Sequence, residues 1–343
     1  MYRALEEVRY NQWALHALAR LRIVCPQVVA IDTETSGLEF HDFPFCATLS
    51  FRGPRGIENH YIALEGEGEE RRKALLSLCL TLSPTWLFHN AKFDLQKLVL
   101  AGVITMADVE QTRIEDTSIV FHLLNENEPK GLKHLAREVL KETTDEEETL
   151  AKVRRKLKLK KADGYFLIPR EFIIPYALKD TEFTLRLYET ARQRIEERGD
   201  GLERVYALEL QVMRTLLRME SVGFKLDVDF LKQAASEYGI KVMEGWAEIV
   251  SITGNLDFNP QSPMQLLSAF EKVGVILEST GESTLKEIQH PLAQAVLHYR
   301  SNKKIHTTYL QALQKENRNG MIHPNFNSAG ARTGRMSSSK ATA

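Results

Sequence analysis

Val28-Val29-Ala30-Ile31-Asp32-Thr33 is the stretch that decides the fold, and Glu34 follows it directly. Its first four residues are apolar and mostly β-branched, which is typical of a central strand buried on both faces. The stretch then ends in acidic residues. We therefore predict a central strand that carries two carboxylates, Asp32 and Glu34, at its end.

The two carboxylates are expected to lie side by side. Asp32 and Glu34 are two residues apart, and side chains at that spacing on a strand point to the same face. Like charges so close disfavour joint ionisation. A purely structural role is therefore disfavoured unless a cation lies between them, although strand ends often carry exposed acids.

Strands and helices alternate around this strand. Strand patterns occur at Phe45–Phe51, His60–Leu64 and Thr85–Phe88. Helical patterns occur at Glu69–Leu82 and at Ala91–Ala101, which Gly102 ends. This alternation predicts an α/β sheet. Later in the chain, Leu202–Ser221 and Asp229–Thr253 are long amphipathic helical stretches, so we predict a boundary near Glu197–Gly201.

Composition sets further limits. A chain of 343 residues favours two domains, each able to bury its own core, and a net charge of -1 means that any DNA-binding surface is a local patch. Cys25, Cys46 and Cys79 are an odd, widely spaced set, which predicts reduced core thiols in a cytoplasmic protein. The N-terminus lacks an apolar signal region, and no stretch is long and apolar enough for a membrane.

Two more motifs carry acids. His89-Asn90-Ala91-Lys92-Phe93-Asp94 follows one strand and opens a helix, where Asn90 is a natural N-cap and Asp94 suits the helix dipole. Tyr176 and Asp180 stand at i and i+4, so they share one helix face, and Pro175 before them is expected at a helix start. Each motif taken alone has an ordinary structural explanation.

The combination is more specific than its parts. A D-x-E strand end, then N-x-x-x-D, then Y-x-x-x-D resembles the three exonuclease motifs of the DnaQ-like, DEDDy superfamily. The resemblance is closest to the proofreading domain of family A, DNA polymerase I-like, polymerases, because Asp116-Thr117 and Gly131–Ala136 lie where that family has its D-T and S-L-A segments. It covers roughly residues 25–195 and implies an RNase H-like α/β exonuclease domain, which we place at residues 1–197.

The resemblance implies hydrolysis of DNA from its 3′ end with two divalent cations, Mg²⁺ or Mn²⁺, about 3.5–4 Å apart. Hard cations of this kind prefer carboxylate oxygens. By the same resemblance, Asp32 bridges both cations, Glu34 and Asp180 complete the site that activates water, and Asp94 serves the second cation through water. Tyr176 orients the attacking water and can take its proton.

Further contacts carry over from the family. Leu38 matches an apolar side chain that wedges against the terminal bases, and Asn90 matches a contact to the terminal nucleotide. Phe93 stands where the family often has Tyr, so the ring survives and the hydroxyl does not. His89 replaces a common Gln, and no role follows for it.

The second half resembles the thumb and the start of the palm of the same polymerases. The segments that carry this resemblance are Met219–Asp227, Asn259–Leu266, Tyr299–Lys304 and Thr333–Ser338. The resemblance implies a mainly α-helical thumb fragment at residues 198–343.

Basic residues of this half suggest contacts with duplex DNA. Arg300, Lys303 and Lys304 are either phosphate contacts to a primer-template or a plain solvated face. Arg335 matches an arginine at the primer end. Asn259 and Ser262 are better explained as helix caps than as DNA contacts.

The sequence stops at Ala343, ahead of the family's palm aspartates, so we expect no primer extension by this chain. A bacterial or phage-encoded monomer in the cytoplasm is expected, acting on single-stranded 3′ ends. The alternatives are a stand-alone DEDDy exonuclease for RNA, as in ribonuclease D, and an inactive DNA-binding scaffold. Another choice stays open for the acidic run Lys141–Glu148 and the basic run Lys152–Lys161. They form either a solvated helical hairpin or mobile excursion, or the basic run is an arm that holds single-stranded DNA phosphates.

Overall fold

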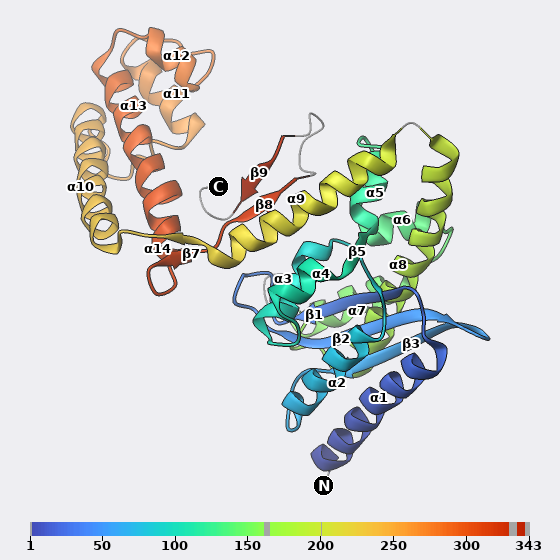
Figure 1. Cartoon of the computed structure of the whole chain (residues 1–343). Coiled ribbons are helices and arrows are strands. Elements are labelled where there is room, and N and C mark those ends of the chain that lie inside the picture. Colours follow the sequence, from blue (N-terminus) through green and yellow to red (C-terminus); the bar gives the residue numbers. More distant parts are fainter. Residues whose placement is uncertain (1, 161–164, 200, 329–334, 340–343) are drawn as a thin grey trace. The chain divides into compact units, whose positions relative to one another are not determined.

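Figure 1 shows a computed structural model of the chain, which describes residues 2–160, 165–199, 201–328 and 335–339. The chain forms two compact units, Met1–Ser221 with Ser328–Met336, and Val222–Asn327 with Ser337–Ala343. The first unit is α/β and the second mainly helical, which confirms the predicted fold class. Lys161 of the basic run and Thr333-Gly334 of the last motif lie outside the described residues.

A five-stranded sheet organises the first unit, in the order β3-β2-β1-β4-β5. Its strands are β1 (Val29–Thr35), β2 (Pro44–Gly53), β3 (Gly56–Ala63), β4 (Thr85–Phe88) and β5 (Arg113–Asp116). β1 pairs antiparallel with β2 and parallel with β4, which is parallel to β5. The carboxyl ends of β1, β4 and β5 therefore meet at one edge, where the acidic motifs begin.

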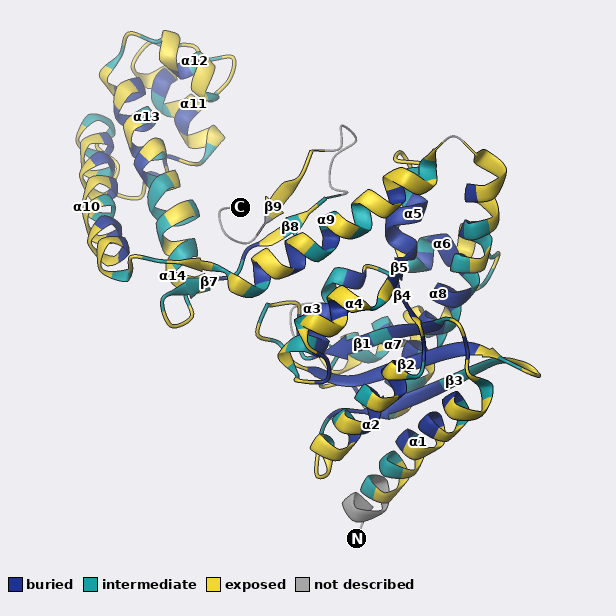
Figure 2. Ribbon diagram, in the orientation of Figure 1, coloured by how far each residue is buried: buried dark blue, intermediate teal, exposed yellow. Residues whose placement is uncertain are grey.

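Helices cover the sheet as the burial colours of Figure 2 show, with dark strands between partly exposed helices. Those of the first unit are α1 (Tyr2–Val24), α2 (Glu69–Thr81), α3 (Ala91–Leu100), α4 (Met106–Gln111), α5 (Thr117–Leu124), α6 (Leu132–Glu138), α7 (Asp145–Lys156), α8 (Arg170–Arg198) and α9 (Leu202–Val222). α8 lies on one face, where its Leu185 packs with Ala30 and Leu87. The other face packs against α1, α2 and α3 through a larger core that includes Ile31.

α9 belongs to this first core as far as Ser221. Its Tyr206, Met213 and Leu217 pack in the same cluster as Ile31. The compact units therefore divide at Ser221, whereas the sequence predicted a boundary between exonuclease domain and thumb at residue 198. That domain boundary stays a prediction.

The second unit packs around helices α10 (Val228–Thr253) and α13 (Pro291–Lys304). Their backbones approach closely at Gly245, where an added Cβ would lie only 3.3 Å from the Cα of Tyr299. The remaining elements are α11 (Pro263–Lys272), α12 (Glu282–Glu287), η2 (Ile305–Gln311), α14 (Ala312–Glu316), β6 (Phe224–Lys225), β7 (Met321–Ile322), β8 (Asn325–Asn327) and β9 (Ser337–Ser339). Ser262 caps α11 as predicted, accepting from the Gln265 amide.

The Met219–Asp227 motif has a local structural explanation. Gly223 has a φ of +71°, and a Cβ there would lie 2.6 Å from the carbonyl oxygen of Ile322. Only glycine fits both demands. Asp227 then caps α10 by accepting from the Phe230 amide.

Two local predictions were wrong. α8 begins at Arg170, so Pro175 lies inside the helix rather than before it, where it removes one backbone donor. Cys25 is exposed, whereas Cys46 and Cys79 are buried as predicted. Cys25 comes directly after the last residue of α1, while the other two lie inside β2 and α2. The sequence also gave no forecast of α1, whose weakly periodic pattern hides its buried residues Ala14, Ala17 and Leu21. Among the described helices, none has the length and apolar character needed to cross a membrane.

His60 of β3 gives the fold an acid-sensitive point. It is buried and stacked on Phe51, with ring centroids 5.3 Å apart. Burial, and then the charge of His16, lower its pKa from 6.5 to about 4. The unfolded chain therefore binds this proton more readily, so we expect the free energy of unfolding to fall as the pH drops from 6.5 towards 4.

Denaturant titrations of the wild type and His60→Phe across that window would measure the effect. Buried carboxylates act in the opposite sense in part of the same window, so the difference between the two profiles isolates the histidine. Parallel profiles would show that His60 does not contribute.

Candidate active site

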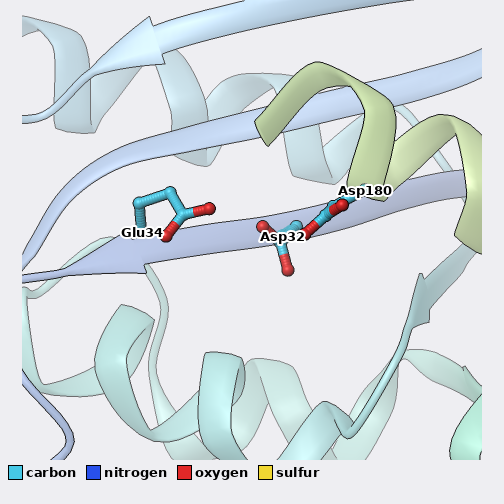
Figure 3. A group of neighbouring side chains, drawn as sticks. All are labelled: Asp32, Glu34 and Asp180. Carbon is cyan, nitrogen blue, oxygen red and sulfur yellow. The ribbon is translucent and has the colours of Figure 1, made fainter. Parts of the chain in front are cut away.

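Asp32 and Glu34 extend from the same face of β1, toward α8. Ala30 packs against Leu185 of α8, and the two-residue period of the strand places Asp32 and Glu34 on that same face. Asp180 of α8 lies opposite them. One carboxylate oxygen from each of the three residues lies within 4.8 Å of the others, and Figure 3 shows the three side chains converging.

Two hydrogen bonds hold α8 against the sheet close to Asp180. The hydroxyl of Thr48 donates to the carbonyl of Ala177 (3.1 Å), and the hydroxyl of Ser50 donates to that of Thr181 (2.7 Å). Both partners are neighbours of Asp180 on the helix. The position of Asp180 relative to β1 is therefore set by buried polar contacts with β2.

Tyr176 lies one turn before Asp180, as its spacing predicts. Its side chain is buried, and its ring meets that of Tyr165 edge-on, with the ring centroids 5.5 Å apart. Burial, and then the charge of Asp180, raise the pKa of Tyr176 well above 10. The phenol is therefore neutral at ordinary pH and is available as a donor.

The carboxylates repel one another strongly. Burial, followed by the charges of Asp94 and Glu34, raises the pKa of Asp32 well above its usual value. Burial also raises the pKa of Glu34, and it raises that of Asp180 to about 6. Asp32, Glu34 and Asp180 therefore offer only carboxylate oxygens, which are the ligands that a hard divalent cation prefers. A bound cation would also offset the repulsion between them.

Asp94 lies beside the three-carboxylate group rather than in it. Its Oδ1 accepts from the amide of Thr33 (2.8 Å) and from the Thr33 hydroxyl (2.7 Å). Thr33 points to the face of β1 opposite Asp32, so Asp94 approaches from α3 on that side. Burial raises the pKa of Asp94 to about 7.

Lys133 was missed by the sequence reasoning as a site residue. This buried lysine of α6 donates to Asp180, and its Nζ lies 3.0 Å from Glu146 Oε1 and 4.2 Å from the centre of the Tyr176 ring. It was visible only as the third residue of the Gly131–Ala136 segment. No spacing rule connects that segment to Asp180.

Asp116 is a second residue whose role the sequence did not reveal. Its carboxylate accepts from the amides of Asn90 (3.0 Å) and Ala91 (2.7 Å) at the start of α3. It also accepts from the amides of Ser118 and Ile119 at the start of α5. One carboxylate thus caps two helices, including the helix that carries Asp94.

This arrangement corrects the predicted role of Asn90. Asn90 stands at the N-cap position of α3 but has a φ of 75°, and its side chain makes no capping bond. Asp116 performs the capping from β5 instead. The Asn90 side chain is exposed at the edge of the sheet where the carboxylates lie.

The other residues that were predicted to contact DNA near this site differ in their exposure. Leu38 is 63% exposed in the loop after β1, and Phe93 is half-buried in α3. Lys97 of the same helix donates to the carbonyls of Glu39 and Phe40, which ties that loop to α3. His89 has its pKa lowered to about 4 by burial, and its Nδ1 hydrogen-bonds with Thr117.

Residues 145–148 of the acidic run and 152–156 of the basic run lie in α7, and residues 157–158 form the turn after it. Leu150 is buried with Tyr176 and Ile173, so this helix packs on α8 beside the site. Glu146, in the first turn of this helix, forms an ion pair with Lys133. The helical part of the earlier expectation is confirmed, while the DNA-phosphate role of the basic run stays a prediction.

The predicted basic DNA contacts differ in whether they already bond to other parts of the protein. Arg300 donates to the carbonyls of Pro260 (3.2 Å) and Thr280 (2.5 Å), so it ties α13 to two loops. Lys303 is half-buried and Lys304 is exposed in the last turn of the same helix. Arg335, in the first unit, is exposed.

Comparisons with known proteins agree with this geometry. Residues 10–196 match the family described as 3′-5′ exonuclease, and residues 228–342 match DNA polymerase family A. The chain is 29% identical to the DNA polymerase DpoZ of Vibrio phage phiVC8, over 91% of this chain and 54% of that protein. It is 30% identical to DNA polymerase I of Treponema pallidum, over 74% of this chain and 25% of that protein.

The fold comparison gives the same result. The chain resembles the POL domain of Pol1 from M. smegmatis, solved in complex with DNA primer-template and dNTP, with a TM-score of 0.69 and 20% identity over 95% of this chain and 54% of that one. This likeness shows a shared fold. The chain spans between a quarter and about half of the length of the curated relatives named above.

Proposed function

This chain belongs to the 3′-5′ exonuclease family, with a second part of the family A DNA polymerases, and we propose that it removes nucleotides from 3′ ends of DNA by a two-metal mechanism. In this proposal it is the proofreading part of a family A polymerase that serves DNA replication or repair. The observation that supports it most is the convergence of one carboxylate oxygen from each of Asp32, Glu34 and Asp180 within 4.8 Å, with Tyr176 one turn before Asp180 on α8.

The residues present fit a pair of divalent cations, with Mg²⁺ or Mn²⁺ proposed. When bound, such cations supply a nucleophile from water and neutralise charge on the phosphate. Asp32, Glu34 and Asp180 would hold the first cation. Asp94, one of whose oxygens is occupied by Thr33, has its other oxygen for the second, directly or through water.

The remaining groups act on the substrate. Tyr176 orients the attacking water from its place beside Asp180. Asn90 and Phe93, at the start of α3, are proposed to contact the terminal nucleotide, and the exposed Leu38 to separate the last bases. Each of these roles extends the family resemblance to a side chain whose position is compatible with it.

The second part is proposed to bind duplex DNA. Lys303 and Lys304 are proposed as the main phosphate contacts, since Nε and Nη1 of Arg300 already donate to two carbonyls of the protein. Such binding should weaken steeply with salt.

We expect single-stranded DNA 3′ ends to be digested faster than paired ends, because melting a duplex end costs free energy that stacking and phosphate contacts offset only in part. Parallel digestion of DNA single strands, blunt DNA duplex and RNA single strands, with Mg²⁺ titrated from zero, measures this. Preference for RNA would favour the ribonuclease alternative, and no digestion at any Mg²⁺ concentration would favour the inert scaffold.

A further inference from the structure

Lys133 is the one cation that the described residues bring into direct contact with the three-carboxylate group. It is only 9% exposed, and its Nζ donates to Oδ1 of Asp180. Its positive charge also acts to lower the pKa values of Asp32 and Glu34, against the larger effect of their burial. A lysine placed there is bonded to a carboxylate that a metal ion would need.

The ammonium has a second partner outside the group. Glu146 of α7 lies 3.0 Å from Nζ, with its side chain 16% exposed, and it belongs to no metal motif. The rings of Tyr176 and Phe183, at 4.2 and 5.4 Å, line the space around Nζ. The lysine therefore has a way to leave Asp180 without losing its charge partner.

We propose that Lys133 is the built-in counterion of the metal-free site, and that Glu146 receives its ammonium when a divalent cation binds Asp180. The proposal rests on the proposed function, because it takes Asp180 as a metal ligand. Lys133 competes with the metal, and Glu146 reduces that competition. The pair thereby sets the cation concentration at which the nuclease becomes active.

The physical argument is one of charge balance. Without a cation, buried carboxylates so close to one another are costly to ionise, and a buried ammonium offsets part of that cost. With a cation bound, the ammonium at Asp180 becomes a like charge beside the metal and is repelled. A buried lysine without a carboxylate partner would then be strongly unfavourable, so Glu146 is needed to keep it charged.

The test measures binding of Mn²⁺ alone by calorimetry, without DNA, on the full chain. Lys133→Met keeps the length of the side chain and removes its charge, and we expect tighter Mn²⁺ binding by about tenfold or more, the equivalent of about 1.4 kcal/mol. The metal-free melting temperature of this variant should fall, and the increase on adding Mn²⁺ should grow. Glu146→Gln should weaken Mn²⁺ binding, because the ammonium then stays at Asp180.

The double variant makes the test decisive. In a Lys133→Met background, Glu146→Gln should no longer weaken Mn²⁺ binding, since there is no ammonium to receive. Unchanged or weaker Mn²⁺ binding by Lys133→Met would overturn the counterion role. Additive effects in the double variant would overturn the transfer to Glu146.

These outcomes are separate from the fate of the proposed function. If Asp180→Asn binds Mn²⁺ as tightly as the wild type, then Asp180 is not a metal ligand and the proposed function fails first. If Asp180→Asn loses Mn²⁺ binding while Lys133→Met leaves it unchanged, only the counterion proposal fails.

Discussion

Asp32→Ala is expected to abolish 3′-5′ exonuclease activity while the protein stays folded. Asp32 is the residue whose carboxylate faces Glu34, Asp180 and Asp94 together, as the causes of its raised pKa show. Loss of a ligand shared by two cations should cost more than the 10²–10³-fold, or about 3–4 kcal/mol, typical of losing a single preorganised donor. A gel-based digestion assay with saturating Mg²⁺ measures the loss.

The same substitution has a second, opposite effect on stability. Removing one of several repelling buried acids should raise the melting temperature in a chelator and remove most of the stabilisation by Mg²⁺. Asp257→Ala, an exposed acid of the second unit, is the matched control and should behave as the wild type in both assays. Metal-dependent digestion by a folded Asp32→Ala protein would show that the active site has been misplaced.

Local patterns predicted most of the fold because its core elements are strongly patterned. β1, β2, β4 and α3 were located to within about two residues, since a β-branched run and a helical apolar pattern ended by Gly102 follow from their own sequence. The three motifs, in turn, were recognised together because their order matches a family. Their separate spacing would have been insufficient.

Contacts between distant segments were beyond such patterns. Asp116 caps a helix whose start is 26 residues earlier, and Lys133 reaches a carboxylate 47 residues later. Neither pairing leaves a periodic signal, because each depends on how the sheet edge and α8 meet. Pro175 shows the converse: local chemistry favours a helix start there, and the packing of Ile173 in the core extends the helix backwards.

The hydroxyl of Tyr176 has a predicted role that can be separated from its ring. Tyr176→Phe removes the hydroxyl but keeps the edge-on contact with Tyr165 and the ring near Lys133. Because burial and neighbouring acids hold its pKa well above 10, we propose that the phenol acts first as a donor that orients water. We expect slower hydrolysis with nearly unchanged DNA binding.

The expected size lies within the 10²–10⁴-fold range, or about 3–5 kcal/mol, that positioned acid–base groups contribute. Single-turnover digestion gives the rate, and fluorescence anisotropy in a chelator gives the affinity for DNA. Tyr165→Phe is the matched control, since it removes a neighbouring hydroxyl from a ring that contacts Tyr176 edge-on. Cutting at the wild-type rate by Tyr176→Phe would reduce this tyrosine to a packing residue. A loss of equal size in both variants would contradict a role specific to the Tyr176 hydroxyl.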